Sequence, residues 1–200
     1  DRSGYDNHGF CGNPSPKWVS GKVGAGAYDF ALSNSYIEVP YSKSLDLCEE
    51  VTLSAWLKYT KTANAVCMEK SNNNTHYQFQ IMGLNQGCTG PAGRIAFLSH
   101  STSTINAVIT TQSLSDDAWH HIVGTLKDLE AKIYVDGVLN ASKTMTTPPT
   151  SNSLPFRIGQ RINPTSGFEG YVDDIRIYAT ALSAEDIQQL YQSRASLDSK

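Results

Sequence analysis

The chain of 200 residues contains no apolar run that approaches the roughly 18 residues of a membrane-spanning helix. It also has no block of basic residues, and its formal net charge of -3 is small. Nucleic acid and anionic membranes are therefore not the expected partners. No closely spaced cysteine pair is present, which argues against a zinc site. No signal peptide is visible, and the abrupt start at Asp1 leads us to expect a mature protein or a piece of a longer one.

Helical periodicity is scarce as well, and short strand-like segments dominate. Asp136-Gly137, between two apolar runs, predicts a two-residue type I′ hairpin. One helix is predicted after Ser183, a natural N-cap, with an apolar stripe that begins at Ile187. Together these patterns predict an all-β fold, a two-sheet antiparallel β-sandwich with one short C-terminal helix. The predicted strands cover residues 27–32, 35–39, 51–59, 65–70, 76–82, 94–99, 105–110, 119–126, 131–136, 138–143, 155–160 and 170–178.

The last predicted strand carries two adjacent carboxylates, Asp173 and Asp174, that interrupt its apolar pattern. Val172 and Ile175 are three residues apart, which breaks the period of two that a regular strand requires. We therefore expect a β-bulge in this strand. Carboxylates held at such a kink need a partner, and a cation is one candidate.

Four cysteines are spread through the strand-rich sequence, an even number that suggests two disulfides and an oxidising compartment. Four buried, reduced thiols are the alternative. Of the three pairings that four cysteines allow, we favour Cys67–Cys88, which would tie the hairpin at 66–82 to the loop after it. This choice leaves Cys11–Cys48 as the second disulfide.

An ordered set of segments over nearly the whole chain resembles the laminin-G-like, concanavalin A-like jelly-roll domains. Each segment alone is a weak signal, but their shared order is specific. The resemblance implies one jelly-roll domain over residues 1–193, followed by a polar tail at 194–200. The cysteines and an insertion-like stretch at 85–93 depart from the family pattern. The segments are Asp1–Gly9, Gly21–Gly24, Ala27–Phe30, Tyr36–Pro40, Ser44–Leu47, Thr52–Lys58, Trp119–Thr125, Lys132–Leu139, Phe156–Gly159, Gly170–Tyr178 and Ala181–Glu185.

The resemblance also implies a structural calcium ion where the first and last strands of the jelly roll meet. Calcium prefers six to eight oxygen ligands from carboxylates, carbonyls and amide side chains. Asp173 or Asp174 would anchor the ion. In the alternative, these carboxylates cap turns or pair with Arg2, Lys22 or Arg176. The full set of expected ligands is Asp1, Asn7, Asp29, Asn34, Asp173 and Asp174.

The same fold hosts glycoside hydrolases and lyases, and retaining hydrolysis needs two carboxyl groups about 5–5.5 Å apart. Relatives with that activity carry them on one strand as Glu-x-Asp-x-x-Glu, and no such run occurs. The nearest match, Glu169–Asp174, has the wrong spacing, and Glu49-Glu50 is expected to be solvated. No nucleophile elbow is present either. We therefore predict that the domain is not an enzyme.

His120-His121 are adjacent on a predicted strand, so they point to opposite faces and cannot easily share one metal ion. We interpret the Trp119-His120-His121 motif as structural, with one histidine hydrogen-bonded inside the sandwich. Trp18 and Trp56, like Trp119, lie in motif-like runs and are interpreted as core residues.

Sugar recognition uses aromatic platforms together with planar polar side chains. In Tyr77–Ile81, an inward-facing Phe79 would leave Gln78 and Gln80 on the solvated face. Tyr59 and Phe168, like Tyr77, are predicted loop aromatics that would stack on a sugar. Ordinary outward polar alternation is the alternative for each of these residues. The predicted ligand-binding set is Tyr77, Gln78, Gln80, Arg94 and His100.

These inferences favour a non-catalytic, extracellular recognition module, secreted or at the cell surface. Its expected ligand is a polysaccharide or cell-surface glycan, with no nucleic acid partner and no membrane insertion. Protein–protein adhesion is the alternative, because the same fold serves in matrix and cell-surface proteins. Fold alone does not decide between these functions.

Overall fold

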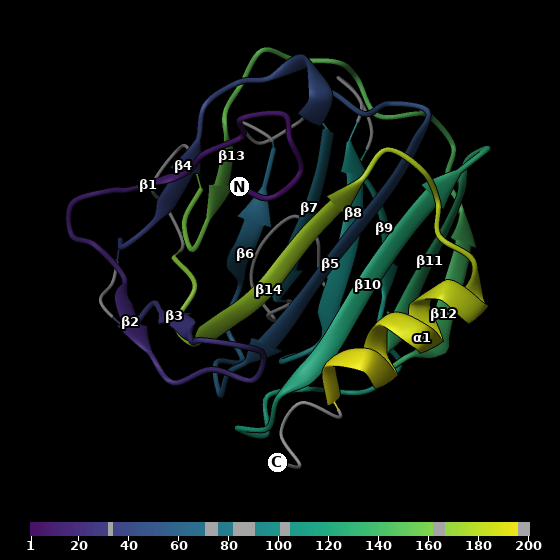
Figure 1. Ribbon diagram of the computed structural model, residues 1–200. Coiled ribbons are helices and arrows are strands. Elements are labelled where there is room, and N and C mark those ends of the chain that lie inside the picture. Colours follow the sequence, from purple (N-terminus) through teal and green to yellow (C-terminus); the bar gives the residue numbers. More distant parts are fainter. Residues whose placement is uncertain (32–33, 71–75, 82–90, 101–104, 162–166, 196–200) are drawn as a thin grey trace.

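The structure is a computed structural model that describes residues 1–31, 34–70, 76–81, 91–100, 105–161 and 167–195. Within these residues, two seven-stranded antiparallel sheets face each other, and one helix lies against the outer face of the second sheet (Figure 1). The predicted all-β sandwich with a short C-terminal helix is therefore confirmed. No described helix is long and apolar enough to cross a membrane.

The first sheet, here sheet A, runs in the order β1 (Phe10–Cys11), β4 (Ile37–Val39), β13 (Phe156–Ile158), β6 (Ala65–Glu69), β7 (His76–Ile81), β8 (Ile95–His100) and β9 (Ile105–Ile109). The second, sheet B, runs in the order β12 (Val138–Thr144), β11 (Glu130–Val135), β10 (His120–Lys127), β5 (Glu50–Lys58), β14 (Tyr171–Tyr178), β3 (Ala27–Asp29) and β2 (Lys17–Val19). A 3-10 turn, η1 (Lys43–Leu45), and the helix α1 (Ala184–Ala195) complete the described elements. Helix α1 runs two residues past the domain end expected at 193.

Each of the twelve predicted strands overlaps a strand of the structure. The two strands that the sequence did not predict are β1 and β2, which form an edge of sheet A and of sheet B respectively. They hold only two and three residues, and most of these residues are exposed. Pro14 and Pro16 interrupt the chain between them. Neither strand therefore carries the buried apolar residues that mark a strand in the sequence, whereas β3, β4 and β13, with three residues each, are partly buried and were predicted.

The core lies between the sheets and depends on alternation along the central strands. In β5, Leu53 and Leu57 point into the core, so Ser54 and Trp56 point to the outer face of sheet B. Gly124 of β10 lies where aromatic rings of sheet A pack closely against sheet B. A side chain there would meet Phe97 and Phe79 from sheet A, so only glycine leaves room for both rings.

Two local predictions about backbone shape are confirmed. The register between β14 and β5 shifts between Asp173 and Arg176, and Asp174 has a φ of 43°, so β14 contains the expected bulge. At the β11–β12 turn, Asp136 and Gly137 have φ values of 51° and 80°. Positive φ at both central residues is the requirement of a type I′ hairpin.

The helix α1 begins with a reciprocal cap. The hydroxyl of Ser183 accepts the Asp186 amide at 3.1 Å, and the Asp186 carboxylate accepts the Ser183 amide at 3.2 Å. This arrangement satisfies backbone donors that a helix start otherwise leaves open. Ile187 is fully buried and contacts Val123 and Tyr134 on the outer face of sheet B. The helix is thus attached to the face of the sheet that points away from the core.

The buried carboxylate of Asp173 joins β14 to the connection between β2 and β3. One of its oxygens accepts the amides of Lys22 and Val23 at 2.8 Å and 2.7 Å, and the other accepts the amide of Asp174 at 2.7 Å. Burial raises the pKa of this carboxyl, although the amides of Val23, Asp174 and Lys22 oppose the shift. Asp173 therefore anchors a loop rather than leaving its oxygens open to solvent.

We expect Gly124→Ala to lower the free energy of unfolding by about 1–3 kcal/mol, the usual cost of overpacking a core. The new methyl group would lie 2.5 Å from Phe97, so one sheet must move. Urea denaturation followed by circular dichroism measures the loss. Gly167→Ala is the matched control, because the nearest atom lies 3.5 Å from its added carbon. Equal stability of the two variants would contradict the proposed close contact.

We expect Asp173→Ala to cost about 3 kcal/mol, because it leaves up to three amides without an acceptor, two of which lie on a loop 150 residues away in sequence. Asp29→Ala removes a single acceptor for the exposed Ala31 amide and should cost less than about 1 kcal/mol. Denaturant midpoints of the two variants give the comparison. A loss for Asp173→Ala no larger than that for Asp29→Ala would show that the carboxylate is not an anchor.

Candidate functional site

A row of side chains crosses the outer face of sheet B near the ends of its strands. Tyr171 of β14 lies opposite Lys58 of β5 on one side and opposite Asp29 of β3 on the other. Lys17 of β2 continues the row beyond Asp29. These residues point outward because their neighbours along the strands, such as Val172, fill the core.

Trp119 closes the other end of this row, because it directly precedes the first residue of β10. Its ring centroid lies 6.2 Å from that of Tyr171, with an interplanar angle of 56°. The Lys58 ammonium lies 5.7 Å from the Tyr171 centroid. With Val19 and Ser20, these three side chains line an open cavity of about 410 Å³, here the aromatic pocket.

The aromatic pocket combines three chemical properties in one place. Two partly exposed rings offer faces for an apolar surface, and Lys58 and Ser20 offer hydrogen-bond donors. The Asp117 carboxylate lies 3.5 Å from the Lys58 ammonium and so fixes the position of the cation. The Asp117 amide donates to the Tyr59 carbonyl at 3.3 Å, which attaches the β9–β10 loop to the end of β5.

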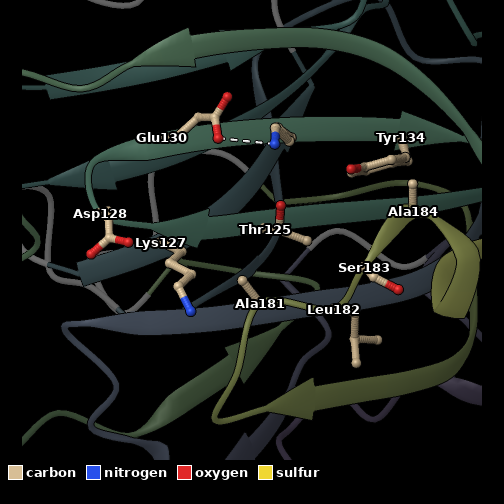
Figure 2. A pocket seen from close by; sticks show the side chains of 10 residues that line it. Thr125, Lys127, Asp128, Glu130, Tyr134, Ala181, Leu182, Ser183 and Ala184 are labelled. Carbon is tan, nitrogen blue, oxygen red and sulfur yellow. Dashed lines mark ion pairs between the residues drawn. The ribbon is translucent and has the colours of Figure 1, made fainter.

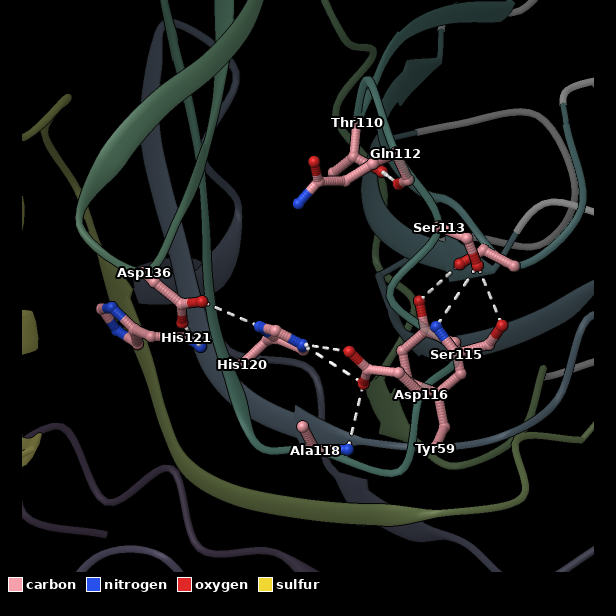
Figure 3. A network of polar contacts seen from close by, with 11 residues as sticks. Tyr59, Thr110, Gln112, Ser113, Ser115, Asp116, Ala118, His120, His121 and Asp136 are labelled. Atoms are coloured by element: carbon pink, nitrogen blue, oxygen red, sulfur yellow. Dashed lines mark hydrogen bonds and ion pairs between the residues drawn. The ribbon is translucent and has the colours of Figure 1, made fainter.

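Below the pocket, His120 bridges two carboxylates in an arrangement that we name the His120 clamp (Figure 3). Its Nδ1 lies 2.8 Å from Asp136 of the β11–β12 turn, and its Nε2 lies 3.3 Å from both oxygens of Asp116 in the β9–β10 loop. The hydrogen bond to Asp136, followed by the contacts with Asp116, raises the pKa of His120 against the opposing effect of burial. Asp136 also accepts the amide of His121 at 2.9 Å.

The adjacent His121 has the opposite environment, on the outer face beneath helix α1. Its ring contacts both Trp56 and Tyr191, at centroid distances of 5.3 Å and 6.1 Å, and these two rings also stack on each other at 5.7 Å. Its Nε2 lies 2.9 Å from the Ser54 hydroxyl. Burial lowers the pKa of His121 to about 4. The other ring nitrogen and the Trp56 Nε1 are buried and have no hydrogen-bond partner among the described residues.

A second cavity of about 430 Å³ lies on the same face, between the β10–β11 hairpin and the segment that leads into α1 (Figure 2). Its charges largely cancel, because Lys132 pairs with Glu130 at 2.9 Å and Lys127 pairs with Glu50 at 2.8 Å. Its one aromatic ring, Tyr134, is only 4% exposed. This charged cleft therefore offers a ligand no free cation and no stacking surface comparable to the aromatic pocket.

The six expected calcium ligands do not form one site. No group of His, Cys, Asp or Glu side chains in the described ranges is arranged to hold a metal ion. Asp173 accepts backbone amides, and Asp174 pairs with Arg176 at 3.0 Å. Asp1 accepts the amide of Asn7, Asn7 donates to Ser44, Asp29 accepts the amide of Ala31, and Asn34 accepts from Gln160.

Most of these side chains therefore already have hydrogen-bond or ion-pair partners within the protein. The alternative from the sequence, carboxylates that pair with Arg176 and cap turns, is what the structure contains. Calcium binding by the domain stays a prediction.

The expected ligand-binding set is wrong for its aromatic member. Tyr77 is fully buried, and its hydroxyl donates to the Leu45 carbonyl at 3.0 Å. Tyr59 and Phe168 are also core residues rather than loop platforms. Arg94 is half-buried and donates to the Thr110 carbonyl at 3.2 Å. The side chains of Gln78, Gln80 and His100 lie outside the described part of the chain, so their role stays a prediction.

Of the two predicted disulfides, one is absent and the other involves a residue that the structure does not describe. Cys11 is an exposed free thiol, so the expected Cys11–Cys48 disulfide is absent. The reason is local, since Cys11 pairs with Ile37 across sheet A and its thiol contacts the hydroxyl of Tyr28. Cys67 lies in the core, and Cys88 falls outside the described residues, so the Cys67–Cys88 disulfide stays a prediction.

The sequence interpretation missed Trp119 and Tyr171 as site residues. Of the three tryptophans assigned to the core, Trp18 is 58% exposed and Trp119 is a pocket wall, whereas Trp56 is buried but lies on the outer face of sheet B. The sequence held one indication of this: Trp119 lies at the end of a predicted strand, close to Asp117, and at such a position the alternation of apolar and polar residues does not determine whether a side chain is buried.

Comparison with known proteins supports the family. A laminin G family model, described as the concanavalin A-like lectin/glucanases superfamily, matches residues 32–188. The chain is 26% identical over 178 residues to the adhesion G-protein coupled receptor V1 of Danio rerio, a match that covers 86% of this chain and 3% of the receptor.

Solved structures share the fold at lower identity. The binding domain of Paraclostridial mosquitocidal protein 1 aligns with a TM-score of 0.76 and 17% identity, over 96% of this chain and 49% of that one. The binding domain of botulinum neurotoxin DC, in complex with rat synaptotagmin II, aligns with a TM-score of 0.75 and 13% identity, over 97% and 48%. A structure of botulinum neurotoxin type C, which depends on two ganglioside molecules to enter cells, aligns with a TM-score of 0.74 and 14% identity, over 97% and 48%.

The chain thus spans about half of these structures and a small part of the receptor. Because the family model covers most of the sequence and the sandwich agrees with it, the chain belongs to the concanavalin A-like lectin/glucanases superfamily.

Proposed function

We propose that this domain is a non-catalytic, extracellular recognition module that binds carbohydrate in the aromatic pocket. The observation that carries the proposal is the arrangement of Trp119, Tyr171 and Lys58 around an open cavity on a rigid sheet. Its volume lies within the roughly 300–1,000 Å³ of ordinary ligand pockets.

A sugar ring has one face of C–H groups and a rim of hydroxyl groups. The C–H face would lie against the rings of Trp119 and Tyr171, which are tilted with respect to each other and so can contact more than one side of a ligand. The hydroxyl groups would accept hydrogen bonds from the Lys58 ammonium and the Ser20 hydroxyl. Because strands β5 and β14 fix two of these side chains, the pocket is largely formed before a ligand arrives.

The carboxylates near the pocket support binding rather than hydrolysis. Asp117 is paired with Lys58, and Asp173 accepts three backbone amides. A glycosidase needs one carboxyl that donates a proton and a second that attacks or activates water. Groups committed to an ammonium and to amides are poorly suited to either role.

The relatives support the same class of function. The zebrafish relative is a receptor, and the solved structures named above are toxin binding domains. One of those toxins interacts with gangliosides. An extracellular position would agree with a cell-surface relative.

Protein–protein adhesion is the second candidate, and an exposed edge of the sandwich favours it. Phe10 of β1 and Trp18 of β2 are 52% and 58% exposed, on the edge strands of the two sheets. A botulinum neurotoxin with this fold is bound to synaptotagmin II. A partner at this edge would bind beside the Trp18–Tyr28 ring pair, whose centroids are 4.9 Å apart.

We expect Trp119→Ala and Tyr171→Ala each to weaken glycan binding by about tenfold, the loss that corresponds to one stacked ring and its buried area. A glycan array identifies the ligand, and titration calorimetry measures the loss. Tyr5→Ala is the control, because Tyr5 is an exposed aromatic residue that lies in the N-terminal segment, outside the aromatic pocket. Thermal melts verify that each variant is folded.

Unchanged affinity in both pocket variants would remove the aromatic pocket as the site. If the wild-type domain binds no glycan but captures a protein, and Trp18→Ala abolishes that capture, the adhesion candidate replaces the carbohydrate proposal.

A further inference from the structure

Two residues of the aromatic pocket depend on one short segment, the end of the β9–β10 loop. Trp119 forms a wall of the pocket, and Asp117 holds the Lys58 ammonium at 3.5 Å. Asp117 has a φ of 62°, a conformation that is uncommon for residues other than glycine and that the contacts around it help to hold. The contacts that hold this segment therefore determine the shape of the pocket.

The His120 clamp supplies part of those contacts, beside the backbone hydrogen bond from Asp117 to Tyr59. Asp116 accepts the Ala118 amide at 3.0 Å and approaches His120 Nε2 at 3.3 Å, so the turn closes on the imidazole (Figure 3). On the opposite side, Asp136 belongs to the β11–β12 turn, whose shape is fixed by a type I′ hairpin. The clamp therefore joins a loop to a rigid turn through one titratable ring.

We propose that the His120 clamp is a proton-dependent positioning device, which holds Trp119 and Asp117 in the binding geometry only while His120 is protonated. Its effect on ligand affinity rests on the carbohydrate site proposed above. Its effect on the position of Trp119 does not.

The number of ring protons provides the physical reason. A protonated imidazole donates from both nitrogens, so it can satisfy Asp136 and Asp116 at the same time. A neutral imidazole has one N–H, and its second nitrogen presents a lone pair to a carboxylate. The shorter contact, 2.8 Å to the less exposed Asp136, is retained, and the contact to Asp116, which is 56% exposed, is lost.

The pH range follows from the direction of the shift. The pKa of His120 is raised above its usual value near 6.5, chiefly by the hydrogen bond to Asp136. Stabilisation from the charged form is complete below the usual value and is lost as the pH rises through the raised pKa. The clamp is therefore closed in mildly acidic solution and opens towards alkaline pH.

Among the residues that the structure describes, the charged groups that act on His120 are its two partners. Asp116 comes from the β9–β10 loop and Asp136 from the β11–β12 turn. On its own strand, His121 points to the opposite face, and burial lowers the pKa of His121 to about 4, so it stays neutral throughout this range. Tyr59, at the end of β5, is near Asp116, and burial raises its pKa, so it also stays neutral.

Nuclear magnetic resonance of the whole domain tests the clamp without a ligand. We expect the Trp119 indole N–H signal, assigned with Trp119→Phe, to shift with pH at the same midpoint as the ring nitrogens of His120, above about 6.5. His120→Gln and Asp116→Asn should abolish that shift. His8→Gln, which changes an exposed histidine of the N-terminal segment, should leave it intact. A Trp119 indole signal whose chemical shift stays constant while His120 titrates would overturn the proposal.

The same glycan array, run at about pH 6 and about pH 9, tests the consequence for binding. We expect wild-type affinity to fall about fivefold at the higher pH, the effect of one partly exposed ion pair. The His120→Gln variant should bind weakly and equally at both values. Wild-type binding that depends on Trp119 but not on pH would overturn the clamp and leave the carbohydrate site standing. If the wild-type domain binds no glycan at either pH, but the Trp119 and His120 signals still shift with the same midpoint, the carbohydrate site is contradicted and the clamp is not.

Discussion

The close approach of the two sheets is the constraint on which the rest of this structure depends. Phe97 and Phe79 of sheet A fill the space above Gly124 of sheet B, and this contact fixes which face of β10 points inward. Because β5 pairs with β10 and β14 pairs with β5, the inward face of β10 also determines which residues of β5 and β14 point inward. A slip of one residue would turn every outward side chain into the core. The position of the pocket residues is therefore a consequence of core packing, not of the pocket itself.

Helix α1 determines how much of the outer face remains available. Its Ile187 and Tyr191 cover the middle of sheet B, where Tyr191 stacks on the ring of Trp56. Beyond the helix, the next outward residue of β5 is Lys58, and this end of the sheet stays open. The aromatic residues of one continuous face thus divide into a covered group that stabilises the helix and an open group that can meet a ligand. Coverage by the helix, rather than residue type, separates the two groups.

Alternation and turn chemistry made most of the fold predictable. The twelve predicted strands and the Asp136-Gly137 hairpin are local patterns, and so is the bulge that Val172 and Ile175 indicated. The candidate site, by contrast, is formed by residues that lie far apart in the sequence. Whether an aromatic residue at a strand end is buried depends on what faces it from another part of the chain, so Tyr77 and Trp119 were each assigned to the wrong environment.

The acidic residues show the same limitation. Asp173 was correctly recognised as a carboxylate in need of a partner. Sequence could not reveal that the partners are the amides of Lys22 and Val23, because these meet Asp173 only when β3 pairs with β14. A carboxylate that accepts backbone amides and a carboxylate that binds calcium look alike in sequence, because an Asp at a bulged strand supplies the same oxygens in both cases.

The adjacent pair His120 and His121 shows how one strand can divide two tasks between identical side chains. Strand alternation places His121 under the helix, where desolvation lowers its pKa, and places His120 between carboxylates, where hydrogen bonds raise its pKa. The backbone joins them, yet Asp136 accepts from the ring of one and from the amide of the other. Because burial lowers the pKa of His121, the aromatic cluster beneath the helix does not itself gain a proton in the range in which His120 titrates. A response to pH at this strand would be confined to the loop that carries Trp119, because only that side of the strand holds a group that titrates above the usual histidine range.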